Sequence, residues 1–294
     1  MFKRIRAFFL TLTLNHFPMK IPSSLFFAAA LTLCAFAGER PRAAFKVLFS
    51  NDTTNITTCK APWKDDRREM TEDYIRASVD ELKGSGIDVH MLQPGMGWVP
   101  WWPSKVLPME KHTAWKKSQG LRVDGWYEQQ VLNGLDIAAI FVEQCRKAGQ
   151  HPFFSFRMND QHHIYGNDKL EPEEFEKKAG VYQFYKENPQ WRIGADGGMG
   201  RVGALSMNFA VPEVRNYRLM QIKELIENYD IDGFELDFMR HIEMFNQKDT
   251  TSEQREEILI SIVQEVRDAL DAKGKKAGRY LYLSVRIPAY PEVY

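Results

Sequence analysis

The stretch Tyr-Asp-Ile-Asp-Gly-Phe-Glu-Leu-Asp-Phe-Met-Arg, residues 229–240, decides the interpretation of the fold. Within it, apolar and polar side chains alternate with the period of two that is typical of a β-strand. One face carries Phe234, Leu236 and Phe238, and the other carries Gly233, Glu235 and Asp237. A strand buried on both faces of a parallel sheet is apolar throughout. The alternation therefore predicts a strand, Gly233 to Phe238, with one face in the core and one polar face.

Four more strand-like segments lie on either side of this one. They are Phe45 to Asn51, Ile87 to Leu92, His151 to Met158 and Tyr280 to Ile287. Helical segments separate the strands: about Glu72 to Lys83, Asp136 to Lys147, Pro212 to Asn228, and Ser252 to Ala272 with an expected end at Gly274. Alternating strands and amphipathic helices predict right-handed crossovers and a parallel sheet.

Two features favour a barrel over an open, doubly wound sheet. The first strand is followed by Ser-Asn-Asp-Thr-Thr, residues 50–54, and not by a glycine-rich phosphate-binding turn. The third and fifth strands also carry polar faces, which contain Arg157 and Arg286. We therefore predict an α/β fold of the (β/α)8 TIM type. Only five strands are recognisable, so residues 45–294 are expected to form the N-terminal part of the barrel, with a shorter open sheet as the alternative.

The N-terminus resembles an export signal. Lys20 follows Met19, and an apolar run of about 13 residues, Leu25 to Ala37, ends in Ala35-Phe36-Ala37. This run is shorter than the roughly 20 residues that span a bilayer. We expect residues 1–37 to be a signal peptide, with Met19 as the true start and a secreted or periplasmic product. Lipid attachment at Cys34 is disfavoured, because Leu33 is bulky where a small residue is required.

Cysteines and net charge limit the remaining possibilities. Beyond the signal peptide only Cys59 and Cys145 remain, and their spacing favours two free or buried thiols over a disulfide. Lys plus Arg and Asp plus Glu both number 39, so no net charge favours nucleic acid or an anionic membrane. A carbohydrate partner fits the 13% aromatic content better.

Aromatic and histidine side chains gather in two long segments, residues 93–133 and 159–211, which are expected to be loops at the carboxyl ends of strands. Loops at this end build the active sites of barrels. Trp98, Trp101 and Trp102 are interpreted as a sugar-stacking platform. The adjacent His162 and His163 lack metal-ligand spacing, so sugar contact or loop packing is expected for them, and no metal or cofactor is predicted.

Glu235 and Asp237 are the predicted catalytic residues. Glycoside hydrolysis uses two carboxyl groups, one protonated and one ionised, and positions i and i+2 of a strand place two of them roughly 6 to 7 Å apart. Arg157 and Arg286 are expected to face them. The alternative is that both acids only form ion pairs with these arginines. Asp237 is the stronger candidate, a partner acid on a later strand stays open, and Asp232 is expected to shape the entry to the strand.

Residues 229–240 resemble the fourth-strand signature of glycosyl-hydrolase-like family 10 proteins and related bacterial barrels. The matching positions are Asp232, Gly233, Asp237, Phe238 and Arg240. The resemblance implies a barrel that acts on polysaccharide, with Arg157, Asn159, Arg240 and Arg286 among the substrate-binding residues. A chitinase-like site is disfavoured, because Met239 stands where chitinases carry the proton-donating glutamate.

The leading hypothesis is an exported glycoside hydrolase without a cofactor. The first alternative is a barrel that binds carbohydrate without cleaving it. The second is a metal-dependent deacetylase or other hydrolase that uses His162 or His163.

Overall fold

The computed structural model describes residues 44–58, 60–64, 70–121, 123, 126–164, 174, 182–197 and 200–288. Residues 1–43 lie outside this part of the chain, so the signal peptide and Cys34 stay predictions. Cys59 also lies outside it, whereas Cys145 is buried with a free thiol. No helix of the described residues is both long enough and apolar enough to cross a membrane.

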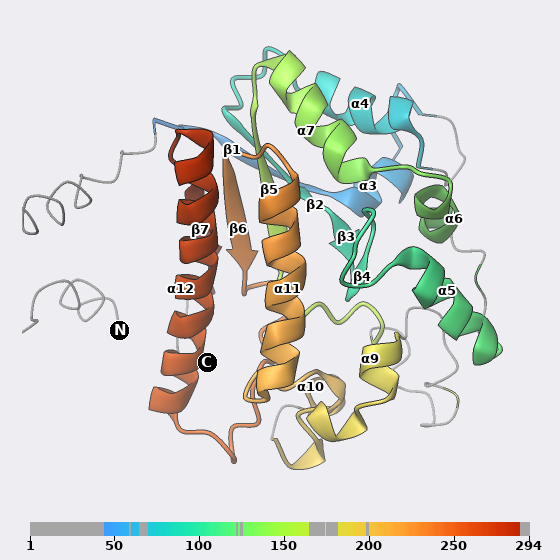
Figure 1. Ribbon diagram of the computed structural model, residues 1–294, viewed down its shortest axis with the longest axis vertical. Helices are drawn as coiled ribbons and strands as arrows, with labels where there is room; N and C mark the ends of the chain where they lie inside the picture. The colour runs from blue at the N-terminus through green and yellow to red at the C-terminus, as the bar shows by residue number, and fades with distance from the viewer. Residues whose placement is uncertain are drawn as a thin grey trace, which may run out of the picture. The chain divides into compact units, whose positions relative to one another are not determined.

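Five parallel strands form the central sheet (Figure 1). They are β1 (Leu48–Asp52), β2 (Val89–Gln93), β5 (His151–Arg157), β6 (Gly233–Asp237) and β7 (Tyr282–Arg286). Their order in the sheet is their order in the chain, β1-β2-β5-β6-β7. A doubly wound sheet reverses its order at a switch point, whereas a (β/α) barrel adds each strand beside the one before it. The strand order therefore confirms the predicted α/β class and the barrel-type arrangement.

Helices cover one face of this sheet (Figure 1). They are α4 (Glu72–Asp80), α7 (Ile137–Ala148), α11 (Pro212–Asn228) and α12 (Ser252–Ala277). Their buried side chains form one apolar cluster with the outward residues of the strands, among them Leu92, Phe154, Phe234 and Leu236. The opposite face carries a separate small cluster of Val89, Met91 and Phe153. Helices on a single face are what successive right-handed crossovers in one direction produce.

The inner face of the sheet is layered along the strands. Strand pairing places Met91, Phe153, Gly233 and Tyr282 in one row across β2, β5, β6 and β7. The next row toward the carboxyl ends is polar: Ser155, Glu235 and Ser284. The last row is charged: Arg157, Asp237 and Arg286. Apolar residues thus fill the lower part of the inner face, and ionisable groups collect at the end where barrel enzymes place their sites.

Helix α12 corrects one predicted boundary. The helix continues through Gly274 to Ala277 and ends at Gly278, which has the left-handed φ of 67° that a helix C-cap favours. Gly274 has another role: a Cβ there would lie 2.5 Å from the carbonyl oxygen of Arg279. The glycine therefore permits the chain to fold back closely against the last turn before β7.

The two segments predicted as long loops contain further elements. The first holds the short hairpin β3 (Gly95–Met96) and β4 (Val99–Pro100), followed by α5 (Met109–Ser118) and α6 (Trp126–Leu132). The second holds α9 (Gln183–Lys186) and α10 (Gly200–Leu205). The prediction of long loops was wrong where these helices and strands lie. Short helices with mixed aromatic and charged faces lack the periodicity that marks a core helix in sequence.

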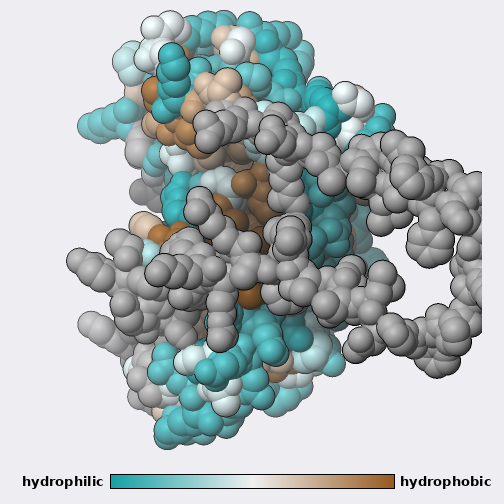
Figure 2. Space-filling view, turned by 90° about the vertical axis from the view of Figure 1, so that its left-hand side faces the viewer, coloured by the Kyte–Doolittle hydropathy of each residue, from teal (hydrophilic) through white to brown (hydrophobic). Residues whose placement is uncertain are grey.

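Strand β7 leaves apolar surface at the edge of the sheet. Figure 2 views the molecule from the side of α12 and β7 and shows hydrophobic surface between hydrophilic regions. Among the described residues, Val285 and the adjoining Ile287 are each 41% exposed. Within the described sheet, β7 pairs with β6 on one side and is the last strand in the order.

Candidate functional site at the carboxyl ends of the strands

Glu235 occupies the polar row of the inner face and is surrounded by donors. Ser155 Oγ donates to its Oε1 at 2.7 Å, and Ser284 Oγ donates to its Oε2 at 3.4 Å. Arg286 Nη2 lies 2.8 Å from Oε1. The residue is only 5% exposed. These contacts make Glu235 a buried partner of an arginine, which is the structural alternative to catalysis considered for it.

Asp237 lies one row nearer the open end of β6. Its Oδ1 accepts hydrogen bonds from the backbone N–H groups of Met239 at 2.9 Å and Arg240 at 3.1 Å. Its Oδ2 lies 3.7 Å from Nη1 of Arg286. The carboxylate is therefore oriented by the backbone and is only 4% exposed.

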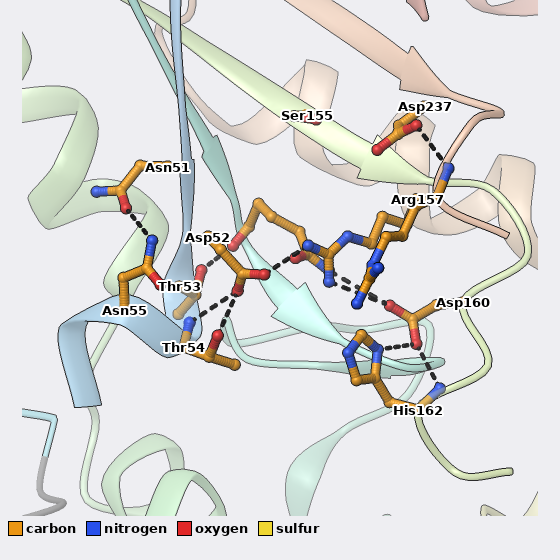
Figure 3. Close-up of polar contacts among 12 residues, drawn as sticks. Asn51, Asp52, Thr53, Thr54, Asn55, Ser155, Arg157, Asp160, His162 and Asp237 are labelled. Carbon is orange, nitrogen blue, oxygen red and sulfur yellow. Dashed lines mark hydrogen bonds and ion pairs between the residues drawn. The ribbon is translucent and has the colours of Figure 1, made fainter. Parts of the chain in front are cut away.

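Arg157 and Arg286 have different partners, and only those of Arg286 match the prediction. Arg286 pairs with both Glu235 and Asp237, as expected. Arg157 instead bridges Asp52 of β1 at 2.5 Å and Asp160 after β5 at 3.8 Å (Figure 3). Strand β2 lies between β1 and β5, so the long side chain of Arg157 reaches past β2 to meet Asp52.

Asp52 is held in its ionised form by this arrangement. Burial raises its pKa, but the charge of Arg157 and hydrogen bonds from Thr54 outweigh burial and leave the pKa below its usual value. Thr54 donates to Asp52 Oδ1 through both its backbone N–H and its hydroxyl (Figure 3). Asp52 therefore belongs to the charged end of the sheet, although it was not predicted as a site residue.

A third group, Asp160, His162 and His241, completes the site. Asp160 Oδ1 accepts hydrogen bonds from the backbone N–H of His162 at 2.9 Å and from His162 Nδ1 at 2.6 Å (Figure 3). Burial raises the pKa of Asp160, but the bond and charge of His162 dominate and hold that pKa far below its usual value. The rings of His162 and His241 lie 5.6 Å apart, edge to face. Burial lowers the pKa of His241 to about 4, so its imidazole is neutral at physiological pH.

Arg218 of α11 supports the end of β5 from the helical side. Its guanidinium donates to the carbonyl oxygens of Arg157 and Met158. It also stacks over the rings of Trp98 and Phe156, with distances to the ring centroids of 4.4 and 4.2 Å. Burial lowers the pKa of Arg218 to about 10, so the group remains charged at neutral pH. This cation fixes the backbone that presents Arg157.

The three tryptophans do not form a sugar platform, so that prediction was wrong. Trp98, Trp101 and Trp102 are 1%, 1% and 3% exposed. Trp98 packs on Arg218, and Trp101 stacks on Tyr127 with ring centroids 4.7 Å apart. The indole of Trp102 donates to Glu224 at 3.0 Å. The rings instead pack the β3–β4 hairpin and its flanks against the barrel, which was the alternative for each of them.

Asn159 and His163 also have packing roles. Asn159 is 2% exposed, and its Nδ2 donates to the carbonyl oxygens of Met207 at 2.9 Å and Glu243 at 2.6 Å, so it ties three chain segments together. His163 lies between two tyrosine rings of the second segment, 5.2 and 4.5 Å from them. Burial lowers its pKa to about 3. The substrate contact predicted for these two residues is not supported, because little of either side chain is exposed.

The remaining predicted residues lie at opposite ends of β6. Arg240 is exposed and lies three residues after Asp237. Asp232 precedes β6 at the other end and accepts from Arg146 at 2.6 and 2.7 Å and from His151 at 2.6 Å. Asp232 thus anchors the entry of the strand, far along the strand from the charged end.

Asp52, Asp160 and His241 were missed because each was considered only within its own segment. Asp52 ends β1, Asp160 follows β5 by three residues and His241 follows β6 by four. Polar residues that directly follow parallel strands meet at one edge, and that rule could have found all three.

Comparisons with known proteins give matches to solved structures at low identity and with TM-scores below 0.5. No protein-family model matches the chain, and no curated protein matches it. Similar solved structures include α-L-fucosidase isoenzyme 2 from Paenibacillus thiaminolyticus, at 13% identity and a TM-score of 0.46, over 82% of this chain and 32% of that one. They also include an α-galactosidase from Lactobacillus brevis, at 17% identity and 0.39, over 82% and 26%. A GH36 α-galactosidase, AgaB from Geobacillus stearothermophilus, matches at 14% and 0.40, over 84% and 28%.

The chain therefore spans about a quarter to a third of the length of these solved structures. They are glycoside hydrolases by name, and identities this low leave the reaction of the present chain undefined. The resemblance to glycosyl-hydrolase-like family 10 proteins stays a prediction. What the structure itself contributes is a parallel α/β sheet of barrel type with acids, arginines and histidines collected at the carboxyl ends of its strands.

Proposed function

We propose that this chain carries part of the active site of a glycoside hydrolase, with Asp237 as its reacting carboxylate. The observation that carries the proposal is the position of Asp237. It ends a central strand, its Oδ1 is held by two backbone N–H groups, and its Oδ2 points to the side of the site where Arg286 lies 3.7 Å away. A carboxylate oriented in this way suits the ionised member of the pair that glycoside hydrolysis requires.

Arg286 and Arg240 have supporting roles in this proposal. Arg286 lies 2.8 Å from Glu235 and 3.7 Å from Asp237, so one cation faces both acids. Arg240 is exposed beside Asp237, and its guanidinium suits hydrogen bonding to sugar hydroxyls. Glu235 is already the buried partner of Arg286, so the proposal does not assign it as the second acid of the pair.

The second candidate function is carbohydrate binding without cleavage. It is favoured by the engagement of Glu235 with Ser155, Ser284 and Arg286, which removes one of the two predicted catalytic carboxyl groups. The same charged end would then only hold a glycan. Export by residues 1–37 is part of both proposals, and it is tested by N-terminal sequencing of the mature protein from the culture medium or periplasm.

The test of hydrolysis compares the full chain with its Asp237→Asn variant on a panel of chromogenic glycosides and soluble polysaccharides. Loss of the reacting carboxylate should lower kcat by on the order of 10²- to 10⁴-fold. Asp232→Asn is the matched control, because it makes the same chemical change at the opposite end of the same strand. Equal turnover by the Asp237→Asn variant would refute the role of Asp237, and glycan binding without cleavage by the wild-type chain would establish the second candidate.

A further inference from the structure

The loops after two neighbouring strands bring three potential metal ligands together. Asp160 and His162 follow β5, and His241 follows β6, which pairs with β5. One ligand atom from each residue lies within 4.8 Å of the other two. Asp160 is 0% exposed, His241 is 4% exposed and the side chain of His162 is 25% exposed. The group is therefore mostly buried and is open to solvent on the side of His162.

We propose that Asp160, His162 and His241 bind one divalent transition-metal ion of the zinc or iron class. Two imidazoles and one carboxylate are a ligand set that such ions accept, with the remaining coordination positions taken by water or substrate. Calcium and magnesium are disfavoured, since they bind oxygen ligands almost exclusively. The proposal is independent of glycoside hydrolysis, because none of its three ligands takes part in the roles assigned to Asp237, Arg240 and Arg286.

The distances are compatible with an ion. Ligands at about 2.1 Å from a tetrahedral zinc ion lie about 3.4 Å from each other. The observed separations reach at most 4.8 Å, so the widest needs to close by little more than an ångström, whereas the 2.6 Å contact between Asp160 Oδ1 and His162 Nδ1 needs to open. Rotation of His162 about its side-chain bonds can supply that movement, because it is the least buried member of the three.

The backbone around the ligands is already fixed. The side chain of Asn159 joins the carbonyl oxygens of Met207 and Glu243, and Gln161 Nε2 donates to Glu243 Oε2 at 3.0 Å. The indole of Trp98 donates to the carbonyl oxygen of Asp160 at 2.9 Å. These contacts hold the β5 and β6 loops against each other, as hydrogen bonds around metal sites commonly do.

His162 and His163 have different neighbours in this arrangement. His162 faces Asp160 and His241, whereas His163 packs between Tyr182 and Tyr185. Adjacent histidines cannot share one ion here, and the ligands that join His162 come from other positions in the chain.

Isothermal titration of the full, chelator-treated chain with Zn²⁺ tests the proposal, with the melting temperature followed in parallel. We expect one ion per chain, a micromolar or tighter Kd, and a rise in melting temperature, since an ion that binds only the folded state stabilises it. His162→Gln should weaken binding by more than the roughly 10- to 100-fold that follows loss of a supporting residue around a metal site. Because His162 is partly exposed, this variant is expected to fold, and its melting curve without zinc checks that it does.

His151→Gln is the matched control, because His151 is an exposed histidine at the opposite end of β5. It should leave zinc affinity unchanged. A wild-type chain that binds no zinc at millimolar concentration, or a site that His162→Gln leaves intact, would overturn the proposal. Asp160, His162 and His241 would then be a hydrogen-bonded cluster only. Failure of this test leaves the turnover of Asp237→Asn unaffected, so the two proposals fail separately.

Discussion

Replacing Gly233 by alanine should strongly destabilise the protein, although both residues are small. A Cβ at Gly233 would lie 2.3 Å from Cε2 and Cζ of Phe153 and 2.7 Å from the carbonyl oxygen of Tyr282. Carbon atoms pack at about 3.5 to 4.0 Å. Phe153 is 2% exposed and packs against Phe45, with ring centroids 5.9 Å apart, so its ring has little space into which it can move.

The expected cost is about 3 kcal/mol, at the upper end of the range for overpacking, because one of the two clashes is with the backbone of β7. Urea denaturation followed by circular dichroism measures this free energy of unfolding. Gly149→Ala is the control: Gly149 has a positive φ of 72° and open space around it, so only backbone strain of about 1 kcal/mol is expected.

A double mutant separates the two clashes. Phe153→Ala removes the ring but leaves the carbonyl oxygen of Tyr282, so Gly233→Ala should cost less in that background by about 1 kcal/mol or more. The reasoning is refuted if Gly233→Ala costs no more than Gly149→Ala, or if its cost is the same with and without the Phe153 ring.

Three further predictions concern charged and titratable groups. Burial lowers the pKa of His90 from 6.5 to about 4, so between these values the unfolded state binds more protons. His90 alone should therefore lower stability by about 3 kcal/mol from pH 7 to pH 4, and His90→Asn should remove this part of the fall in a pH series of urea melts. Arg286→Met leaves the carboxylate of Glu235 buried without its cation, and it should lower the free energy of unfolding, measured by thermal melting, by about 2 kcal/mol. This value is below the usual cost of breaking a buried ion pair because the Arg286 side chain is 33% exposed. Adding Glu235→Gln should recover part of the loss, and no recovery would contradict the pairing. Asp232→Asn weakens charge-assisted hydrogen bonds from Arg146 and should cost about 1 to 2 kcal/mol, a loss that Arg146→Met should largely reproduce in the same assay.

Residues 229–240 illustrate which structural features the sequence pattern could predict. Their alternation predicted a strand with Glu235 and Asp237 on one face, and strand β6 has that arrangement. The order of strands and helices predicted the parallel sheet, and the absence of a glycine-rich turn favoured the barrel-type order that the sheet adopts. These features are periodic and local, so they can be recognised without knowing which segments meet.

The contacts between distant segments could not be predicted from the sequence pattern. Alternation placed Arg157 on the polar face, but only the order of strands decided that it reaches Asp52 and Asp160 while Arg286 takes Glu235 and Asp237. Aromatic content indicated stacking surfaces, but burial decided that Trp98 stacks on the cation of Arg218 and not on a sugar.

The sequence by itself therefore determined the class of fold and the position of the polar strand faces. The tertiary structure alone decided which ionisable groups share an environment. Asp160 and His162 follow β5, whereas His241 lies 79 residues beyond His162 in the chain and is close to them only in space. Sequence separation does not indicate that these residues are close. Strand pairing does, because β5 and β6 lie side by side and the loops that follow them are therefore neighbours.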